Sequence, residues 1–165
     1  FVAMAKAVAA KDPDVQFLFI GEGPLRNRLE FQVISAGLFG RLALPGWRRD
    51  TPELLACSDI FVLTSLWEGL PRALVEAMKT GLVPVCYATD GISDIIRDSE
   101  NGFIVPQGDV QGMAERVLML LKDQALRERL GQAASQSIGD EFDIDLMVRA
   151  QERLCRKLLK NSLHE

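Results

Sequence analysis

The sequence predicts an α/β fold in which a parallel sheet is covered by helices on both faces. Five short segments are apolar along most of their length, as is typical of parallel strands buried on both sides. Helical segments separate them, which favours strand–helix–strand units. At 165 residues and 48% hydrophobic, the chain is expected to form a single domain, residues 1–165, around one core.

The first third of the chain supplies two of these strands. Residues 1–10 are rich in alanine and predict an amphipathic helix, and residues 15–20 predict a strand that ends at a Gly-Glu-Gly-Pro turn. Residues 24–37 carry apolar side chains close to a helical period. Residues 41–44 predict a second strand, which ends at the turn Pro45-Gly46-Trp47.

The middle of the chain supplies the next two strands. Residues 51–56 predict a short helix with Thr51 as its N-cap and Pro52 at its first position. Apolar runs then predict strands at residues 59–65 and 83–88.

The last part of the chain is mainly helical. Residues 93–97 predict a short helix, and residues 103–105 predict the fifth strand. Asp109 is expected to cap a helix over residues 110–121, and residues 124–160 are helical apart from one break. The buried stripe of this last segment is expected to consist of Leu146, Leu154, Leu158 and Leu159.

Composition excludes several classes of function. A net charge of −4 gives no electrostatic reason to expect nucleic acid or an anionic membrane as a partner. Cys57, Cys86 and Cys155 are far apart and flanked by apolar residues, so we expect buried thiols in a reducing, cytoplasmic compartment. The only histidine, His164, lies near the C-terminus, so no histidine-based triad or zinc cluster is expected. We therefore expect neither a metal site nor a cofactor.

Two carboxylates lie eight residues apart in the segment that follows the third strand. Glu68 precedes a helix that we expect to begin at Pro71, and Glu76 lies within this helix. Gly81 is placed just past its end. The expected buried residues of this helix are Ala73, Leu74, Ala77 and Met78.

The start of this helix has no Ser, Thr, Asp or Asn directly before it as a side-chain cap. We therefore expect free backbone N–H groups at Arg72, Ala73 and Leu74, a configuration that attracts phosphate. Because the carboxyl ends of parallel strands form the ligand edge of such sheets, this helix start is a candidate anion site. Glu68 and Glu76 beside it would suit a ligand that also carries hydroxyl groups.

Structural interpretations of the same residues remain open. Glu76 could form a surface ion pair with Arg72 or Lys79, and Glu68 could simply be an acid that favours a helix N-terminus. Gly21 and Gly23 could form only a tight turn. They do not continue a dinucleotide-binding G-x-G-x-x-G motif, because Arg26 stands in place of the third glycine.

Four segments of the chain together form a pattern typical of one protein family. They are G-E-G-P at 21–24, P-G-W at 45–47, S-D-I-F-V-L-T-S-L-W-E-G-L-P-R-A-L-V-E-A-M-K-T-G-L-V-P-V at 58–85 and N-G-F-I-V-P-Q-G-D at 101–109. On these segments, and most of all on the E-x₇-E pattern after the third strand, nearly the whole chain resembles the C-terminal domain of the GT-B retaining glycosyltransferases of the group 1 (family 4) type. The resemblance implies a Rossmann-like three-layer sandwich that forms the C-terminal half of such an enzyme.

The resemblance also implies the ligand and the role of each residue. The domain would hold a nucleoside diphosphate sugar, with Glu68 as the catalytic-site residue on the sugar hydroxyls and Glu76 on the ribose hydroxyls. The sugar oxygens and the diphosphate would be bound by backbone groups of Gly69, Leu70, Pro71, Arg72, Ala73 and Leu74. The nucleotide would lie against Gly21, Gly23 and Pro24, and its base against Pro45, Gly46 and Trp47.

Three departures from the family pattern accompany these expectations. An Arg and a Lys that neutralise the diphosphate in relatives lie upstream of the position where Phe1 begins. The N-terminal acceptor domain is absent, so the chain is expected to be a fragment and inactive alone. Residues 89–93 are also shorter than the usual double-glycine turn.

These observations predict the donor-binding domain of a glycosyltransferase that transfers a sugar to a saccharide or lipid-linked acceptor, in polysaccharide or lipopolysaccharide synthesis. Its partners would be the nucleotide sugar and its own N-terminal domain, and any contact with the inner face of the membrane would be made through that missing half. The alternative is a non-catalytic nucleotide-sugar-binding or regulatory module. A flavodoxin-like signalling domain is disfavoured, because Asp12 and Asp14 precede their strand instead of following it.

Overall fold

The structure is a computed structural model that describes the backbone of residues 1–162 and the side chains of residues 1–159. His164 therefore lies outside the described residues. Residues 1–162 contain five strands: β1 (Phe17–Ile20), β2 (Leu42–Gly46), β3 (Ile60–Leu63), β4 (Val83–Tyr87) and β5 (Phe103–Val105). The helices are α1 (Val2–Ala9), α2 (Arg26–Ser35), α3 (Thr51–Ala56), α4 (Arg72–Lys79), α5 (Asp90–Ser93), α6 (Val110–Lys122), α7 (Gln124–Ser137), the 3₁₀ helix η1 (Asp140–Phe142) and α8 (Ile144–Ser162).

All strand pairs are parallel, as predicted, but the strands are divided between two hydrogen-bonded sheets. One sheet contains β1 and β2, and the other has the order β3-β4-β5. The expected single sheet is interrupted because no strand among the described residues pairs with both β1 and β3. One apolar core nevertheless includes residues of both sheets, among them Phe17 of β1 and Val85 of β4.

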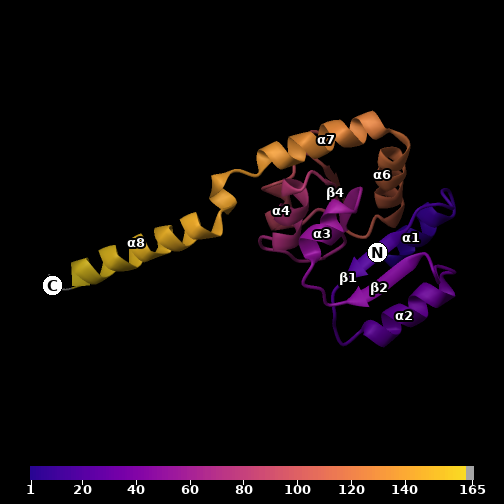
Figure 1. Ribbon diagram of the computed structural model, residues 1–165, viewed down its shortest axis with the longest axis horizontal. Helices are drawn as coiled ribbons and strands as arrows, with labels where there is room; N and C mark the ends of the chain where they lie inside the picture. The colour runs from indigo at the N-terminus through magenta and orange to yellow at the C-terminus, as the bar shows by residue number, and fades with distance from the viewer. Residues whose placement is uncertain (163–165) are drawn as a thin grey trace.

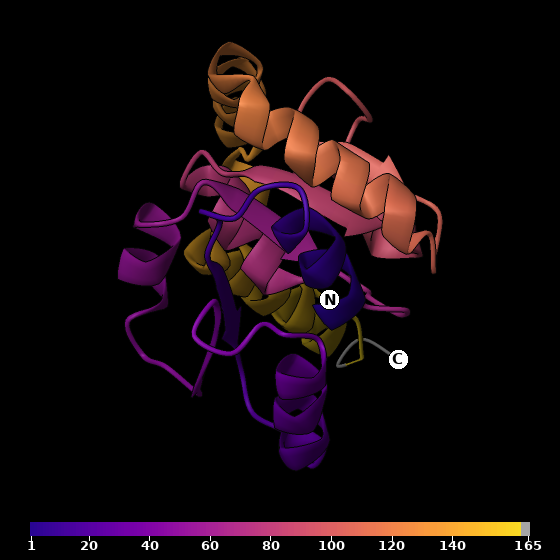
Figure 2. The same cartoon turned by 90° about the vertical axis from the view of Figure 1, so that its right-hand side faces the viewer.

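The three-layer arrangement is clearest at β4, whose five residues are all buried. Val83, Val85 and Tyr87 pack into the core that α1 and α6 share. Cys86 points the other way, into the cluster formed with α4, α5 and α7. Because successive side chains of a strand alternate between its faces, β4 lies between two helical layers. In Figures 1 and 2, α7 and α2 lie at opposite ends of the folded body.

Strand β2 continues two residues further than predicted, through Pro45 and Gly46. The pairing shifts by one residue between Leu18 and Ile20 of β1, so that Ile20 pairs with Gly46. Pro45 falls inside this irregularity. Proline cannot donate to a ladder and is tolerated at such bulges, which explains how the strand passes through it.

Two predicted details of the short helices are wrong. The N-cap position of α3 is Asp50 instead of Thr51, and it makes no side-chain cap, because Arg48 donates hydrogen bonds to its carboxylate. The helix expected at residues 93–97 instead spans Asp90–Ser93. Its first residues, Asp90 and Gly91, are poor helix formers, so their sequence does not indicate where the helix begins.

The predicted buried stripe of the last helix is also wrong. Leu146, Leu154, Leu158 and Leu159 are between 43% and 66% exposed. Figure 1 shows why: α8 projects away from the folded body. Its apolar spacing correctly predicts a helix with an apolar side, but no element of the described chain covers that side. No helix within residues 1–162 has both the length and the apolar character needed to cross a membrane.

The expectation of three buried cysteines holds for one of them. Cys86 is fully buried in β4, whereas Cys57 and Cys155 are exposed. Cys57 follows the end of α3, and Cys155 lies on the projecting helix α8. All three are free thiols.

Candidate donor-binding site

Strand β3 leads into the loop of residues 65–70, which carries Glu68 and connects to α4. Glu68 is half-buried, while Gly69 and Leu70 are exposed. The neighbouring thiol of Cys86 has its pKa raised to about 12, chiefly by burial, and the negative charge of Glu68 contributes to this rise. The Glu68 carboxylate therefore lies near the carboxyl end of the central strand β4, at the edge where ligands bind in such sheets.

The helix start beside Glu68 is open, as predicted, but it is displaced by one residue. Pro71 is the N-cap and has an extended backbone, and α4 begins at Arg72. No side chain in the described part of the chain caps it. The N–H of Leu74 donates to the carbonyl of Pro71 at 3.0 Å, so the expected free group at Leu74 is not available. Within the described residues, the N–H groups of Arg72 and Ala73 have no hydrogen-bond partner.

Helix α4 is held in place by its buried face. Leu74, Ala77 and Met78 are fully buried, whereas Ala73 is exposed, contrary to prediction. Gly81 follows the helix with a φ of +90°, a left-handed conformation that glycine adopts easily and that ends many helices. The apolar face and this terminal glycine fix the direction in which the free N–H groups point.

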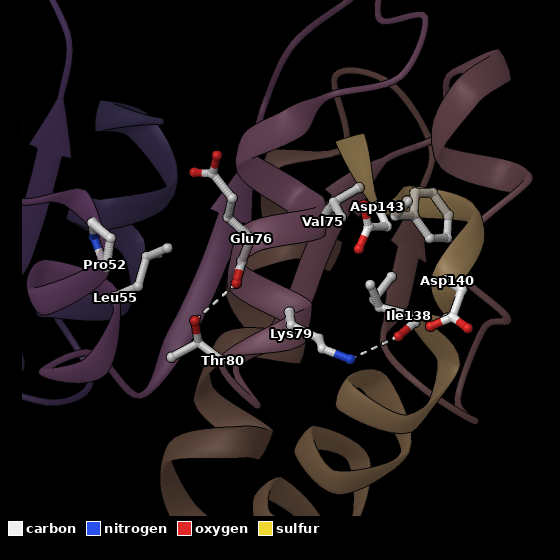
Figure 3. Close-up of a pocket in the computed structure, with 11 residues that line it drawn as sticks. Pro52, Leu55, Val75, Glu76, Lys79, Thr80, Ile138, Asp140 and Asp143 are labelled. Atoms are coloured by element: carbon white, nitrogen blue, oxygen red, sulfur yellow. Dashed lines mark hydrogen bonds between the residues drawn. The ribbon is translucent and has the colours of Figure 1, made fainter. Parts of the chain in front are cut away.

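Glu76 lies on the exposed side of α4 and lines a pocket of about 440 Å³ between α3, α4 and the turn before η1. Its side chain is 47% exposed, and Arg72 lies 3.6 Å away from its carboxylate. Figure 3 shows the Glu76 carboxylate turned toward the side of Pro52 and Leu55, away from Asp140. Lys79 does not pair with Glu76; its ammonium group donates to the carbonyl of Ile138 at 3.0 Å.

The turn after β1 lines a second pocket, also of about 440 Å³. Gly21, Gly23 and Pro24 contribute to it, together with Arg26 of α2 and Leu44 of β2. Arg26 donates to the Leu44 carbonyl at 2.9 Å, which joins α2 to β2 at the mouth of the turn. The predicted turn is thus present, and it lines an open pocket.

The turn after β2 is built around a buried glycine. Gly46 has a φ of +78° and accepts a hydrogen bond from the N–H of Gly21 at 3.0 Å. Trp47 is 65% exposed, and the Arg49 guanidinium lies 5.4 Å from the centre of its ring. A broad, exposed aromatic side chain with a cation above it is suited to packing against a flat ligand group.

The predicted residues fall into two groups in the structure. Glu68, the residues 69–74 and Glu76 lie around the start of α4, beyond the β3-β4-β5 sheet. Gly21, Gly23, Pro24 and residues 45–47 lie together at the carboxyl end of the β1-β2 sheet, since Gly21 and Gly46 are hydrogen-bonded. Glu76 lines the first pocket and the Gly21 turn lines the second, whereas Glu68 lines neither of these two.

Two residues at this edge carry contacts that the sequence does not signal. Gln107, after β5, donates hydrogen bonds from its amide to the carbonyls of Leu66 and Ala88. Gly91, in α5, lies against the backbone of Gly69. Gln107 lies in the matching segment 101–109 and Gly91 in the shortened turn 89–93, but nothing in either segment indicates these contacts. Neither residue could therefore be assigned a positioning role before the fold was known.

Residues 1–137 match the protein family described as glycosyl transferases group 1. The chain belongs to this family. An Escherichia coli relative named UDP-Gal:alpha-D-GlcNAc-diphosphoundecaprenol alpha-1,3-galactosyltransferase is 36% identical over 69% of the chain. The chain spans only 30% of the length of that relative.

Solved structures confirm the fold and the resemblance to a C-terminal glycosyltransferase domain. The C-terminal domain of the group 1 glycosyl transferase LpcC from Francisella tularensis has a TM-score of 0.79 and 28% identity, over 87% of this chain and 78% of that one. The Anabaena protein HepE, solved with UDP-glucose, has a TM-score of 0.82 and 25% identity, over 96% of this chain and 44% of that one. The predicted α/β fold and the resemblance to the C-terminal half of a group 1 glycosyltransferase are thus confirmed.

Proposed function

We propose that this chain binds a nucleoside diphosphate sugar and that the full-length enzyme transfers the sugar, with retention, to a saccharide or lipid-linked acceptor in cell-surface polysaccharide or lipopolysaccharide synthesis. One observation carries the proposal: Glu68 and Glu76 flank an uncapped helix start whose Arg72 and Ala73 N–H groups have no partner within the described residues. A nucleotide sugar has sugar hydroxyls, a diphosphate and ribose hydroxyls in sequence, which correspond in order to Glu68, the helix start and Glu76. The name of the Escherichia coli relative and the ligand of HepE support this class of donor.

The two carboxylates would act on the two hydroxyl-bearing ends of the diphosphate. An ionised carboxylate offers several acceptor sites and no donor, which suits a pair of adjacent hydroxyls. Glu76 would accept from the ribose hydroxyls, because it is accessible and lines a pocket. Glu68 would accept from hydroxyls of the donor sugar, which it orients; the proposal assigns no nucleophile.

The diphosphate would lie at the start of α4. The free N–H groups of Arg72 and Ala73 and the positive end of the helix dipole stabilise negative charge there, and this charge grows as the sugar leaves. Gly69, Leu70, Pro71 and Leu74 form the surrounding backbone. In the family resemblance, the remaining positive charge comes from an Arg and a Lys upstream of Phe1, and we propose that these replace a metal ion.

The nucleoside would extend toward the second group of residues. Gly21, Gly23 and Pro24 line a pocket, and their backbone would approach the nucleotide closely there. Trp47, exposed and preceded by Pro45 and Gly46, would pack against the base. We place the enzyme in the cytoplasm, in keeping with three free thiols, and assign any contact with the inner membrane surface to its N-terminal half.

Calorimetric titration with UDP, GDP and ADP, and with their glucose conjugates, tests the proposal. We expect Glu76→Ala to weaken both the nucleotide and its sugar conjugate by about 10- to 100-fold, because each bond to a charged acceptor contributes ~1.5–3 kcal/mol. Glu68→Ala should weaken only the sugar conjugate. The matched control is Glu115→Ala, which removes an exposed glutamate of α6 that Gln111 hydrogen-bonds.

Unchanged binding in both glutamate variants would overturn the assignment of the site. The same variants placed in the full-length enzyme separate catalysis from mere binding. If that enzyme binds the donor but transfers no sugar to any saccharide or lipid-linked acceptor, the chain is a binding module and the proposed transfer is wrong.

A further inference from the structure

The loop that carries Glu68 is tied to both neighbouring strand ends through one side chain. The amide nitrogen of Gln107 donates to the carbonyl of Leu66 at 2.9 Å and to the carbonyl of Ala88 at 3.1 Å. Leu66 lies in the loop after β3, Ala88 directly follows β4, and Gln107 follows β5. One side chain therefore joins the ends of all three strands of this sheet, two residues before Glu68.

On the other side of Glu68, the backbone of Gly91 supports the same loop. A methyl group added to Gly91 would overlap the carbonyl group of Gly69 and would lie 3.3 Å from the carbonyl oxygen of Glu68. The backbone of Gly91 is not left-handed, so glycine is needed there for space. Gly69 itself has open space around the corresponding position. The close approach thus depends on the absence of a side chain at Gly91 alone.

We propose that Gln107 and Gly91 are positioning residues that hold Glu68 against the donor sugar. The proposal rests on the proposed function, because it assigns Glu68 to the sugar. The loop is fixed at Leu66 by a hydrogen bond and at Gly69 by contact, so the backbone on both sides of Glu68 has little freedom. Neither residue needs to touch the ligand; each determines where the Glu68 carboxylate lies when the donor binds.

The test compares UDP with UDP-glucose, or with the nucleotide and glucose conjugate that bind best in the titration described above. Only the conjugate contains the group that Glu68 would hold. We expect Gln107→Ala and Gly91→Ala to reduce the preference for the conjugate over the nucleotide by about 3- to 10-fold, with nucleotide affinity unchanged. Gln107→Glu keeps the shape of the side chain but loses both donors, so it should reduce the preference at least as much.

Two control variants match these changes closely. Gln111→Ala removes an exposed glutamine whose amide donates to Glu115 on the same helix, and Ser93→Ala alters α5 without approaching Gly69. Both should leave the preference for the conjugate unchanged. The double variant Glu68→Ala with Gln107→Ala should show no loss of preference beyond that of Glu68→Ala, because Gln107 acts through Glu68.

Each outcome has a definite meaning. A wild-type chain that binds none of the nucleotides or conjugates overturns the proposed function, and this inference with it. Normal binding by the wild type, with an unchanged preference in Gln107→Ala and Gln107→Glu, overturns the positioning role alone. A further loss when Gln107→Ala is added to Glu68→Ala would show a general structural effect and would also overturn it. Should Gly91→Ala fail to fold, the two Gln107 variants still decide.

Discussion

The loop of residues 65–70 and the turn around Gly21 lie at the ends of different sheets and are held by different kinds of contact. The first lies above fully buried residues, Cys86 of β4 and Leu74 of α4, and its backbone touches that of Gly91. The second depends on Arg26, which donates to the carbonyl of Leu44 and to the carboxylate of Glu30, both at 2.9 Å. These contacts of Arg26 lie near the surface.

The difference indicates how each part of the candidate site is made precise. Buried apolar contacts and close backbone approach resist displacement whatever the salt concentration, whereas exposed ion pairs contribute little and are screened. The loop of residues 65–70, the proposed sugar-binding side, would therefore be rigid, while the turn around Gly21, on the proposed nucleotide side, would depend on ionic conditions. Three measurements test this difference, and they are given in decreasing order of the expected effect.

Leu74→Ala should have the largest effect on stability. Leu74 is fully buried beneath the start of α4, so its truncation leaves a cavity and is expected to cost about 2–5 kcal/mol in the free energy of unfolding. Leu25→Ala, at a residue 65% exposed beside the other turn, should cost less than ~1 kcal/mol. Urea denaturation of both variants measures the difference. Equal losses would contradict the contrast between a packed and an exposed region.

Alkaline pH should have the next largest effect, a loss of folding stability that arises from the buried thiol of Cys86 in β4. Burial raises the pKa of the Cys86 thiol from an ordinary value of 9.0 to about 12. Above pH 9 the unfolded chain therefore loses a proton that the folded chain keeps, so stability present below pH 9 should fall as pH rises toward 12. The expected slope from this thiol is ~1.4 kcal/mol per pH unit.

Denaturation under reducing conditions at pH 8, 9 and 10 measures this slope. Cys86→Ala should remove the part that begins at pH 9, and Cys57→Ala, which changes an exposed thiol, should not. Burial also raises the pKa of Tyr87, so a decline above pH 10 should remain in Cys86→Ala. A decline that is the same in the wild type and in Cys86→Ala would refute the assignment to this thiol.

The sequence predicts the position of a strand or helix where its buried residues recur at a regular spacing. It does not predict features that depend on contacts between distant segments. Apolar runs located all five strands, because strands buried between layers leave such patterns, and Pro71 and Gly81 located α4. The same pattern predicted a buried side for α8 and was wrong, since periodicity identifies an apolar side without showing what covers it. The predicted N-cap of α3, Thr51, is wrong because the N-cap position is Asp50, whose carboxylate accepts hydrogen bonds from Arg48. Capping preferences consider the residue alone and do not include such a competing partner.

The candidate site shows the same limit. Glu68, Glu76 and the uncapped helix start could be selected, because each has a recognisable spacing or terminus. Gln107 could not, because its two acceptors are backbone carbonyls of residues 41 and 19 positions away. Gly91 could not, because its role depends on the approach of Gly69 from another loop. Residues that position a site through backbone contacts can therefore be identified only once the fold is known.

Arg26→Gln should have the smallest effect, and its salt dependence decides the second half of the comparison. The side chains of Arg26, Glu22 and Glu30 are 37%, 60% and 46% exposed, so the loss should be below ~1 kcal/mol in low salt. Because such exposed pairs are screened, the difference from wild type should shrink by 0.5 M salt. Leu74→Ala should keep its full cost under the same conditions, since burial of apolar surface does not depend on screening. A salt-independent loss for Arg26→Gln would mean that its bond to the Leu44 carbonyl, and not its charge, holds the turn.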